Sequence, residues 1–146
     1  MANEMLVSLL KRSVEEFNMW RTVHPTAHID LSGAELFRTN LERANLDGAD
    51  LSGSNLSDCV MIDASLRRAN LACAKLGGAC CVYANFSGAA LGGVELRGTD
   101  FGSADMLNVS MHNVELAGAC WDQATVDPLL KRRIVAAIRK SIVCPK

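Results

Sequence analysis

The sequence predicts an all-β solenoid, a chain wound into stacked coils, with a helix at each end. Three observations predict it. A large apolar residue recurs at every fifth position, a small residue lies two places before each, and glycines concentrate two places after them. A period of five fits neither a helix, where residues five apart scatter around the axis, nor a strand, where an odd spacing alternates faces. The chain must therefore turn a corner in every repeat to keep these residues inside.

The series of large residues runs from Leu31 to Val126 without a slip. It occupies twenty successive fifth positions in a chain that is 49% hydrophobic. At about even odds per position, chance gives such a run about once in a million, so the series is an internal repeat. From it we assign an inward core ladder: Leu31, Leu36, Leu51, Leu56, Leu71, Leu76, Phe86, Leu96, Phe101 and Trp121.

A second inward track begins at Ala34 and continues at intervals of five to Ala124, mostly as alanine. Large and small residues then alternate along the interior. Such an alternation fills a narrow tube without voids.

Glycines mark the corners of the coil. Eight of the eleven lie two residues after a large residue, and Asn108 and Asn113 occupy the same slot. Gly and Asn readily adopt the positive φ that the third residue of a type II turn requires. At twenty residues per coil the slots sort into four columns, and one column contains no glycine: Arg43, Asp63, Tyr83, Ser103 and Gln123. The sequence therefore predicts a four-sided coil with one corner of a different kind.

Short motifs such as Ala44-Asn45-Leu46, Ala49-Asp50-Leu51, Ala69-Asn70-Leu71 and Ala84-Asn85-Phe86 carry a resemblance to a known family. They resemble the A-(D/N)-L-x-x unit of pentapeptide repeat proteins, over residues 29–128. The resemblance implies a right-handed quadrilateral β-helix of about five coils, with four pentapeptides in each. At the sheet spacing of ~4.8 Å the rod would be about 24 Å long.

Both ends of the rod have a candidate cover. Residues 1–28 are expected to form a capping helix and a linker. Apolar residues recur at helical spacing over residues 4–21, and Pro25 follows. Phe17 and Trp20 are interpreted as part of this cap.

Residues 129–146 are expected to form a basic amphipathic helix. Asp127 is a plausible N-cap and Pro128 suits the first helical position. One stripe of the helix is apolar: Leu130, Ile134, Ala137, Ile138 and Ile142. Three roles stay open for it: covering the coil, pairing with its twin in a dimer, or holding an anionic partner or membrane surface.

Nothing in the sequence indicates catalysis, a cofactor or a metal. The glycines are explained as corners rather than as a phosphate-binding loop, and Pro25 separates His24 from His28. We expect a protein that is not an enzyme. No apolar run has membrane-spanning length and no signal pattern opens the chain, so the expectation is a cytoplasmic protein that does not insert in a membrane.

The six cysteines are expected to be reduced. No CxxC pair occurs, and Cys80 and Cys120 share an outward column two coils apart. Two coils span ~9.6 Å, too far for a disulfide. Cys59 and Cys81 are expected inside, and Cys144 lies in the tail.

The outer surface is where the sequence predicts function. Residues 29–127 contain thirteen acids and six bases, a formal charge of −7, whereas residues 128–146 carry +6. On one side of the coil, outward apolar residues of adjacent coils come together as a predicted interaction patch: Val60, Ile62, Cys80, Val82 and Tyr83. Contiguous exposed apolar surface often marks an interface.

These features favour a non-enzymatic interaction or scaffold module that presents a rigid β-helical surface to a protein partner or to a second copy. The alternative is a DNA mimic that protects or inhibits a type II topoisomerase such as gyrase, as the family resemblance suggests. The acidic residues are scattered over several sides and interrupted by arginines, whereas a mimic needs a continuous anionic track. Direct nucleic-acid binding is not expected.

Overall fold

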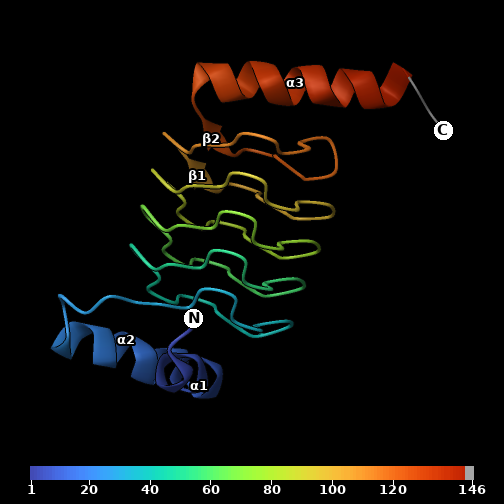
Figure 1. Cartoon of the computed structure of the whole chain (residues 1–146). Helices are drawn as coiled ribbons and strands as arrows, with labels where there is room; N and C mark the ends of the chain where they lie inside the picture. Colours follow the sequence, from blue (N-terminus) through green and yellow to red (C-terminus); the bar gives the residue numbers. More distant parts are fainter. Residues whose placement is uncertain (144–146) are drawn as a thin grey trace.

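The computed structural model describes residues 1–143, without the side chains of residues 142 and 143. Two short helices, α1 (Glu4–Arg12) and α2 (Val14–Val23), lie beneath a stack of coils (Figure 1). The coils include two short strands, β1 (Asp105–Met106) and β2 (Thr125–Val126). Helix α3 (Pro128–Val143) lies across the opposite end. The tail cysteine at position 144 lies outside the described residues.

Backbone hydrogen bonds between successive coils build the stack. Parallel bridges join residues twenty apart, such as Asp30 with Asp50 and Asp50 with Asn70. Within each pair the bonds alternate in direction: the Leu31 amide donates to the Asp50 carbonyl (2.8 Å), and the Asp50 amide donates to the Ile29 carbonyl (2.8 Å). The twenty-residue step is the four-repeat coil that the sequence predicts.

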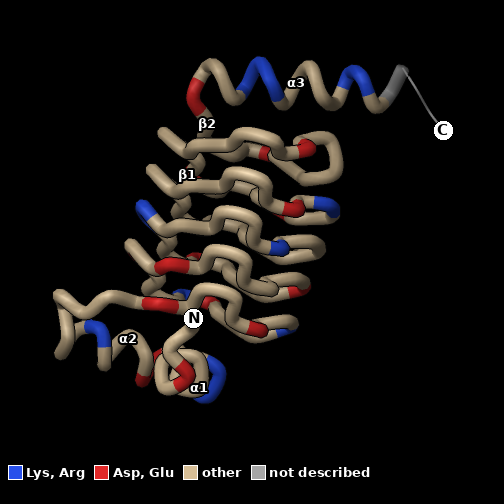
Figure 2. The backbone as a smooth tube through the Cα atoms, in the orientation of Figure 1, with Lys and Arg blue, Asp and Glu red and all other residues tan. Residues whose placement is uncertain are grey.

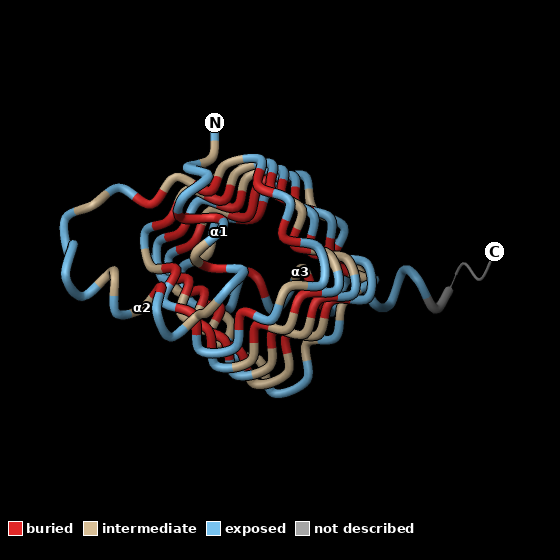
Figure 3. Tube along the Cα trace, turned by 90° about the horizontal axis from the view of Figure 1, so that it is seen from below, coloured by how far each residue is buried: buried red, intermediate tan, exposed pale blue. Residues whose placement is uncertain are grey.

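A core of large and small side chains runs along the axis (Figure 3). Nine of the ten assigned ladder residues are at most 2% exposed. Trp121, in the last coil, is only partly buried, stacks on Phe101 at 4.9 Å, and donates its indole N–H to the Leu116 carbonyl (3.0 Å). It lies at the end of the ladder, where no further coil covers it.

All four corners have the same backbone geometry, so the prediction of one different corner is wrong. The glycine-free column has positive φ throughout, from 54° at Ser103 to 60° at Tyr83. Turn hydrogen bonds close these corners as they close the others, for instance from the Ala84 amide to the Cys81 carbonyl (3.1 Å). The coil imposes a left-handed residue at every corner from Gly33 to Gln123 except Gly118, and non-glycine residues accept it where the surrounding ladder holds them.

The N-terminal cap is two helices rather than the single helix expected over residues 4–21. Ser13 has extended backbone and ends α1, and its hydroxyl accepts the Glu16 amide (3.1 Å) as the N-cap of α2. The signal was present as Ser13-x-x-Glu16, a capping-box pattern. The turn lets Leu10 and Phe17, both at most 1% exposed, reach the core from different directions.

The N-terminal cap also supplies hydrogen bonds to the open edge of the first coil. The Asn3 amide donates to the Asp30 carbonyl (2.8 Å), as a preceding coil would. The Asn18 side chain donates to the Arg43 carbonyl (3.0 Å) and accepts the Asn45 amide (2.8 Å). These groups satisfy an edge that would otherwise pair with another chain.

At the other end α3 covers the coil mainly through residues of its first half, with Ala137 packed against the core from the second half. The Asp127 carboxylate accepts the Leu130 amide (2.9 Å), and Leu130 and Ile134 are buried. Ile138, expected on the same stripe, is 38% exposed. The C-terminal end of α3 extends past the outline of the coils (Figure 3).

Candidate protein-interaction surface

Asx turns explain why Asn or Asp so often precedes the large residue of a repeat. In nine repeats the side-chain oxygen of this residue accepts the backbone amide two residues later. Asn85 accepts the Ser87 amide at 2.9 Å, for example, and Asp100 accepts the Gly102 amide at 2.8 Å. The side chain thus satisfies a donor that the coil-to-coil ladder leaves free.

Val60 and Cys80 occupy this same slot without being able to make the turn. They are bridged to each other, to Asn40 below and to Asp100 above. Asn40 and Asp100 both make Asx turns, to Glu42 and Gly102. Two coils in the middle of one column therefore lack this local hydrogen bond and carry apolar side chains in its place.

The patch residues lie on the outside of the coil in adjacent coils. Val60, Ile62, Cys80 and Val82 are half-buried, and Tyr83 is 63% exposed. Above them, a Cβ placed on Gly102 would lie 3.6 Å from Cγ2 of Val82. The missing side chain at position 102 therefore leaves this edge of Val82 open. Phe37 and Leu107, the other outward apolar residues expected, are 49% and 38% exposed and lie on other sides.

The charges around the patch are one-sided. The residues of this side above the first coil (58–63, 78–83, 98–103 and 118–123) contain four acids and no base: Asp58, Asp63, Asp100 and Asp122. Arg38, from the first coil, pairs with Asp58 at 3.5 Å. The other three acids have no ion pair within residues 1–143. An apolar centre with an anionic rim favours a partner that is basic and apolar together.

A family model for pentapeptide repeats matches the chain in eight copies, over residues 27–53, 49–80 and 84–120. The chain belongs to the pentapeptide repeat family. Its coil is therefore the right-handed quadrilateral β-helix that the resemblance implied. In this chain the Asn or Asp of the family's motif makes the Asx turn, and the large residue that follows it forms the buried ladder.

Several solved pentapeptide repeat structures are similar to the chain. One, from the thylakoid lumen of Arabidopsis thaliana, is 24% identical, with 74% of this chain and 72% of that chain covered and a TM-score of 0.35. Rfr23 from the cyanobacterium Cyanothece is 20% identical, with 76% and 94% covered and a TM-score of 0.37. QnrB1, a plasmid-mediated fluoroquinolone resistance protein, is 15% identical, with 77% and 84% covered and a TM-score of 0.41. No curated protein matches the chain.

A polar cluster on another side of the pentapeptide repeat coil ties its first two turns together. The Asp47 carboxylate accepts from the Arg67 guanidinium (2.5 and 2.9 Å), the Arg67 amide (2.9 Å) and the Ser65 hydroxyl (2.5 Å). Burial raises the pKa of Asp47, but these hydrogen bonds outweigh it and leave the pKa below its ordinary value. Arg21 of α2 donates to the Asp47 carbonyl (2.9 Å), and burial lowers the pKa of this guanidinium. The polar groups of this cluster bind one another, which favours a structural role.

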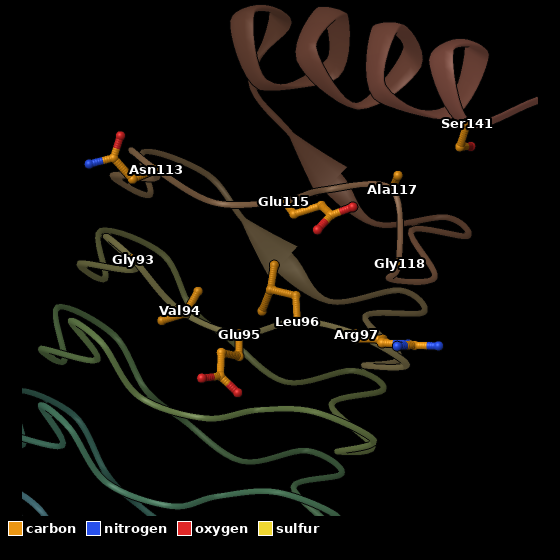
Figure 4. A pocket seen from close by; sticks show the side chains of 10 residues that line it. All are labelled: Gly93, Val94, Glu95, Leu96, Arg97, Asn113, Glu115, Ala117, Gly118 and Ser141. Carbon is orange, nitrogen blue, oxygen red and sulfur yellow. The ribbon is translucent and has the colours of Figure 1, made fainter. Parts of the chain in front are cut away.

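The last coil separates from the one below it on a single side (Figure 4). A cavity of about 610 Å³ opens there, lined by residues of both coils and by Ser141 of α3. Within residues 1–143 no bridge joins Glu95 to Glu115, and the Gly98 amide reaches Gly118 (2.7 Å) rather than residue 117. This opening could not be predicted from the sequence, because Leu116 keeps the five-residue period.

The cysteines differ in environment as expected. Burial raises the pKa of the Cys59 thiol to about 11 and that of Cys81 well above its ordinary range. Cys73 and Cys120 are exposed and Cys80 is half-buried, and all five are free thiols. Among the described residues, no group of three or more His, Cys, Asp or Glu is placed to hold a metal, and no helix is long and apolar enough to cross a membrane.

Proposed function

We propose that this protein is a non-enzymatic interaction module whose binding surface is the patch of Val60, Ile62, Cys80, Val82 and Tyr83. The observation that carries the proposal is the pair of apolar residues Val60 and Cys80 in adjacent coils, in a column where Asn40 and Asp100 make Asx turns. A turn hydrogen bond of this kind contributes about 0.5–1.5 kcal/mol, so fold stability alone favours Asn or Asp at both positions. Residues that reduce stability and increase exposed apolar surface are typical of a binding site.

The patch suits a protein partner because it is rigid. Every backbone segment under it is fixed by the ladder, as in the Met61 amide bonded to the Cys80 carbonyl (2.7 Å). A preorganised apolar surface loses little conformational entropy on binding. Tyr83, exposed at the corner, supplies the kind of aromatic anchor that interfaces favour.

The double variant Val60→Asn/Cys80→Asn separates binding from folding. Each Asn supplies an acceptor for the free amide of Ile62 or Val82, so we expect unfolding at higher urea concentration than the wild type. Two neighbouring residues at the centre of the patch become polar, so we expect the partner to bind at least about tenfold more weakly. The matched control is Ala90→Asn, which adds an Asx acceptor in the same slot on another side of the coil.

Immobilised wild type, double variant and control are compared for proteins captured from a lysate of the source cells. Any captured protein is then purified and titrated by calorimetry. A partner bound by wild type and control but not by the double variant supports the proposal. Equal binding by all three, with the double variant more stable as expected, would show that the patch is not the binding surface.

DNA mimicry is the second candidate function, and the side that carries the patch favours it through its four acids and absence of bases above the first coil. Elsewhere acids and bases mingle on the surface (Figure 2). The ion pairs Arg38–Asp58 and Arg67–Asp47 interrupt the negative potential of the first coils. A gyrase supercoiling assay tests it: inhibition that disappears in an Asp63→Asn/Asp122→Asn variant would support mimicry, and unchanged supercoiling would exclude it.

A further inference from the structure

Helix α3 carries an uncovered face with both apolar and basic residues. Lys131, Val135 and Ile138 recur at i, i+4 and i+7, so they lie on one side of the helix. Val135 is 41% and Ile138 38% exposed, and Arg139 is exposed beside them. The coils lie on one side of α3, and only its C-terminal end extends past them (Figures 1 and 3). Within the described residues this face is left exposed to solvent.

The patch side of the rod is also apolar, but its charged residues above the first coil are acidic rather than basic. Its apolar residues lie in two adjacent coils, and Asp63, Asp100 and Asp122 surround them without ion pairs within the described chain. From Lys131 to Arg139 a helix advances about 12 Å. The acidic rim from Asp63 to Asp122 spans three coil steps, or ~14 Å, so the helix face and the patch with its rim have similar lengths.

We propose that the patch receives α3 from a second copy of this chain, so that two copies associate helix to rod side. Val135 and Ile138 cover Val60, Ile62 and Val82, while Lys131 and Arg139 approach the acids of the rim. This proposal rests on the proposed function and names the partner of the same surface. With a two-fold axis each copy gives its helix to the other, which closes the assembly at a dimer.

Charge argues against the simpler arrangement in which two α3 helices stack on each other. The face of α3 turned away from its own coil carries Arg132 and Arg139, and both are exposed. End-to-end stacking would oppose these arginines to their own copies, and opposed like charges are unfavourable. Placing α3 on the acidic side of another rod turns the same charges into attraction.

Charge reversal with exchange tests the arrangement. The helix variant is Lys131→Glu/Arg139→Glu and the rod variant is Asp63→Lys/Asp122→Lys. Each alone opposes like charges at both contacts of a dimer, whereas a mixture of the two restores opposite charges at both. The control, Glu95→Lys/Glu115→Lys, reverses two exposed acids on the neighbouring side. All are studied as full chains by sedimentation over a concentration series, with circular dichroism as the folding check.

The wild type and the control are expected to form dimers. Each reversed variant alone is expected to dissociate with a Kd at least about tenfold weaker, and the equimolar mixture is expected to recover. Rising salt should weaken the wild-type dimer. Monomeric wild type at every concentration, or a dimer that survives both reversals, would overturn the proposal.

The two proposals fail separately. A monomeric wild type that still captures a foreign protein, and loses it in Val60→Asn/Cys80→Asn, would retain the interaction surface and reject the second copy as its occupant. A dimer abolished by the charge reversals but kept by Val60→Asn/Cys80→Asn would show that α3 docks on the acids away from the apolar patch.

Discussion

At the scale of single residues, the pentapeptide motif supplies hydrogen-bond acceptors for backbone amides that the ladder between coils leaves free. The large residue enters the core, the corner residue turns the chain, and the Asn or Asp between repeats accepts the amide two places on. Where the slot holds another residue, the donor is sometimes met from elsewhere. The Arg67 amide, for instance, reaches the Asp47 carboxylate of the coil below (2.9 Å).

Exchanging residues in this slot should change stability in opposite directions. Asn85→Ala removes the acceptor of the Ser87 amide and should lower the free energy of unfolding by about 0.5–1.5 kcal/mol. Ala90→Asn supplies an acceptor to the Gly92 amide and should raise it by up to a similar amount. Urea unfolding followed by circular dichroism measures both. Equal stability of the two variants would mean that the Asx turns contribute nothing net.

At the scale of elements, polar side chains far apart in the sequence join the cap to the coil and the first coil to the second. Asn18 and Arg21 replace part of a missing coil, and Asp47 links to Arg67 and Ser65. At the other end Arg133 donates to the Met111 carbonyl. Charged and amide side chains therefore join the apolar residues in holding both ends to the coil.

Asp47→Asn should destabilise the protein at neutral pH and make it less sensitive to acid. The pKa of Asp47 is depressed in the folded state, so its charge stabilises the fold above the unfolded pKa of about 3.9. That contribution is lost as pH falls through the folded value, and the variant has none to lose. The gap in unfolding free energy between wild type and variant should therefore shrink from neutral pH toward pH 2, as measured by urea titration at each pH.

The matched comparison is Glu115→Gln, an exposed acid away from the patch side with no ion pair within residues 1–143. Its gap from wild type should be small at every pH. If the Asp47 gap also stayed constant with pH, the ion pair with Arg67 would not be what stabilises the fold.

The sequence was sufficient to predict the features that the five-residue repeat determines. It was insufficient to predict the features that depart from the repeat. Leu31 to Phe101 point inward because one-residue slips would expose the whole series. The break at Ser13 was missed because the apolar spacing of Leu10, Val14 and Phe17 fits one helix as well as two. The fourth corner was wrongly distinguished because a left-handed φ was taken to need Gly or Asn, whereas the coil also holds Arg43 and Tyr83 there.

The outward position of the patch residues could be predicted from the five-residue period alone. Their contrast with the hydrogen-bonding residues of the same column could not. That Val60 and Cys80 replace hydrogen-bonding residues became clear only when Asn40 and Asp100 were seen to make turns in the same column. The exposure of Ile138 on α3 could not be predicted from the sequence either. Amphipathic spacing does not tell how far a helix extends past the coils on which it packs.

At the scale of the whole molecule, stability should vary along the rod. The side that holds Glu95 and Glu115 opens at the last coil, and the Leu96 amide has no backbone acceptor within the described residues. One coil lower, the Leu76 amide donates to the Glu95 carbonyl (2.9 Å). On the next side of the last coil the Phe101 amide is bonded to Cys120 (2.9 Å).

Hydrogen exchange followed by NMR should resolve these three amides. Leu96 should exchange at least about tenfold faster than Leu76, with Phe101 closer to Leu76. The reason is that exchange at Leu96 needs no opening of the ladder. Equal protection of Leu96 and Leu76 would show that the last coil closes fully onto the rod in solution.

The bridges between residues twenty apart have one more consequence, which concerns length. Because each coil repeats the same backbone step, the rod is a ruler graduated in units of ~4.8 Å, with α3 at one end and the apolar patch at a fixed mark. Inserting or deleting one whole coil between them would move the helix by one graduation without changing either surface. Two chains with identical surfaces and different coil counts would then fail to recognise each other, so coil number itself can encode the identity of a partner.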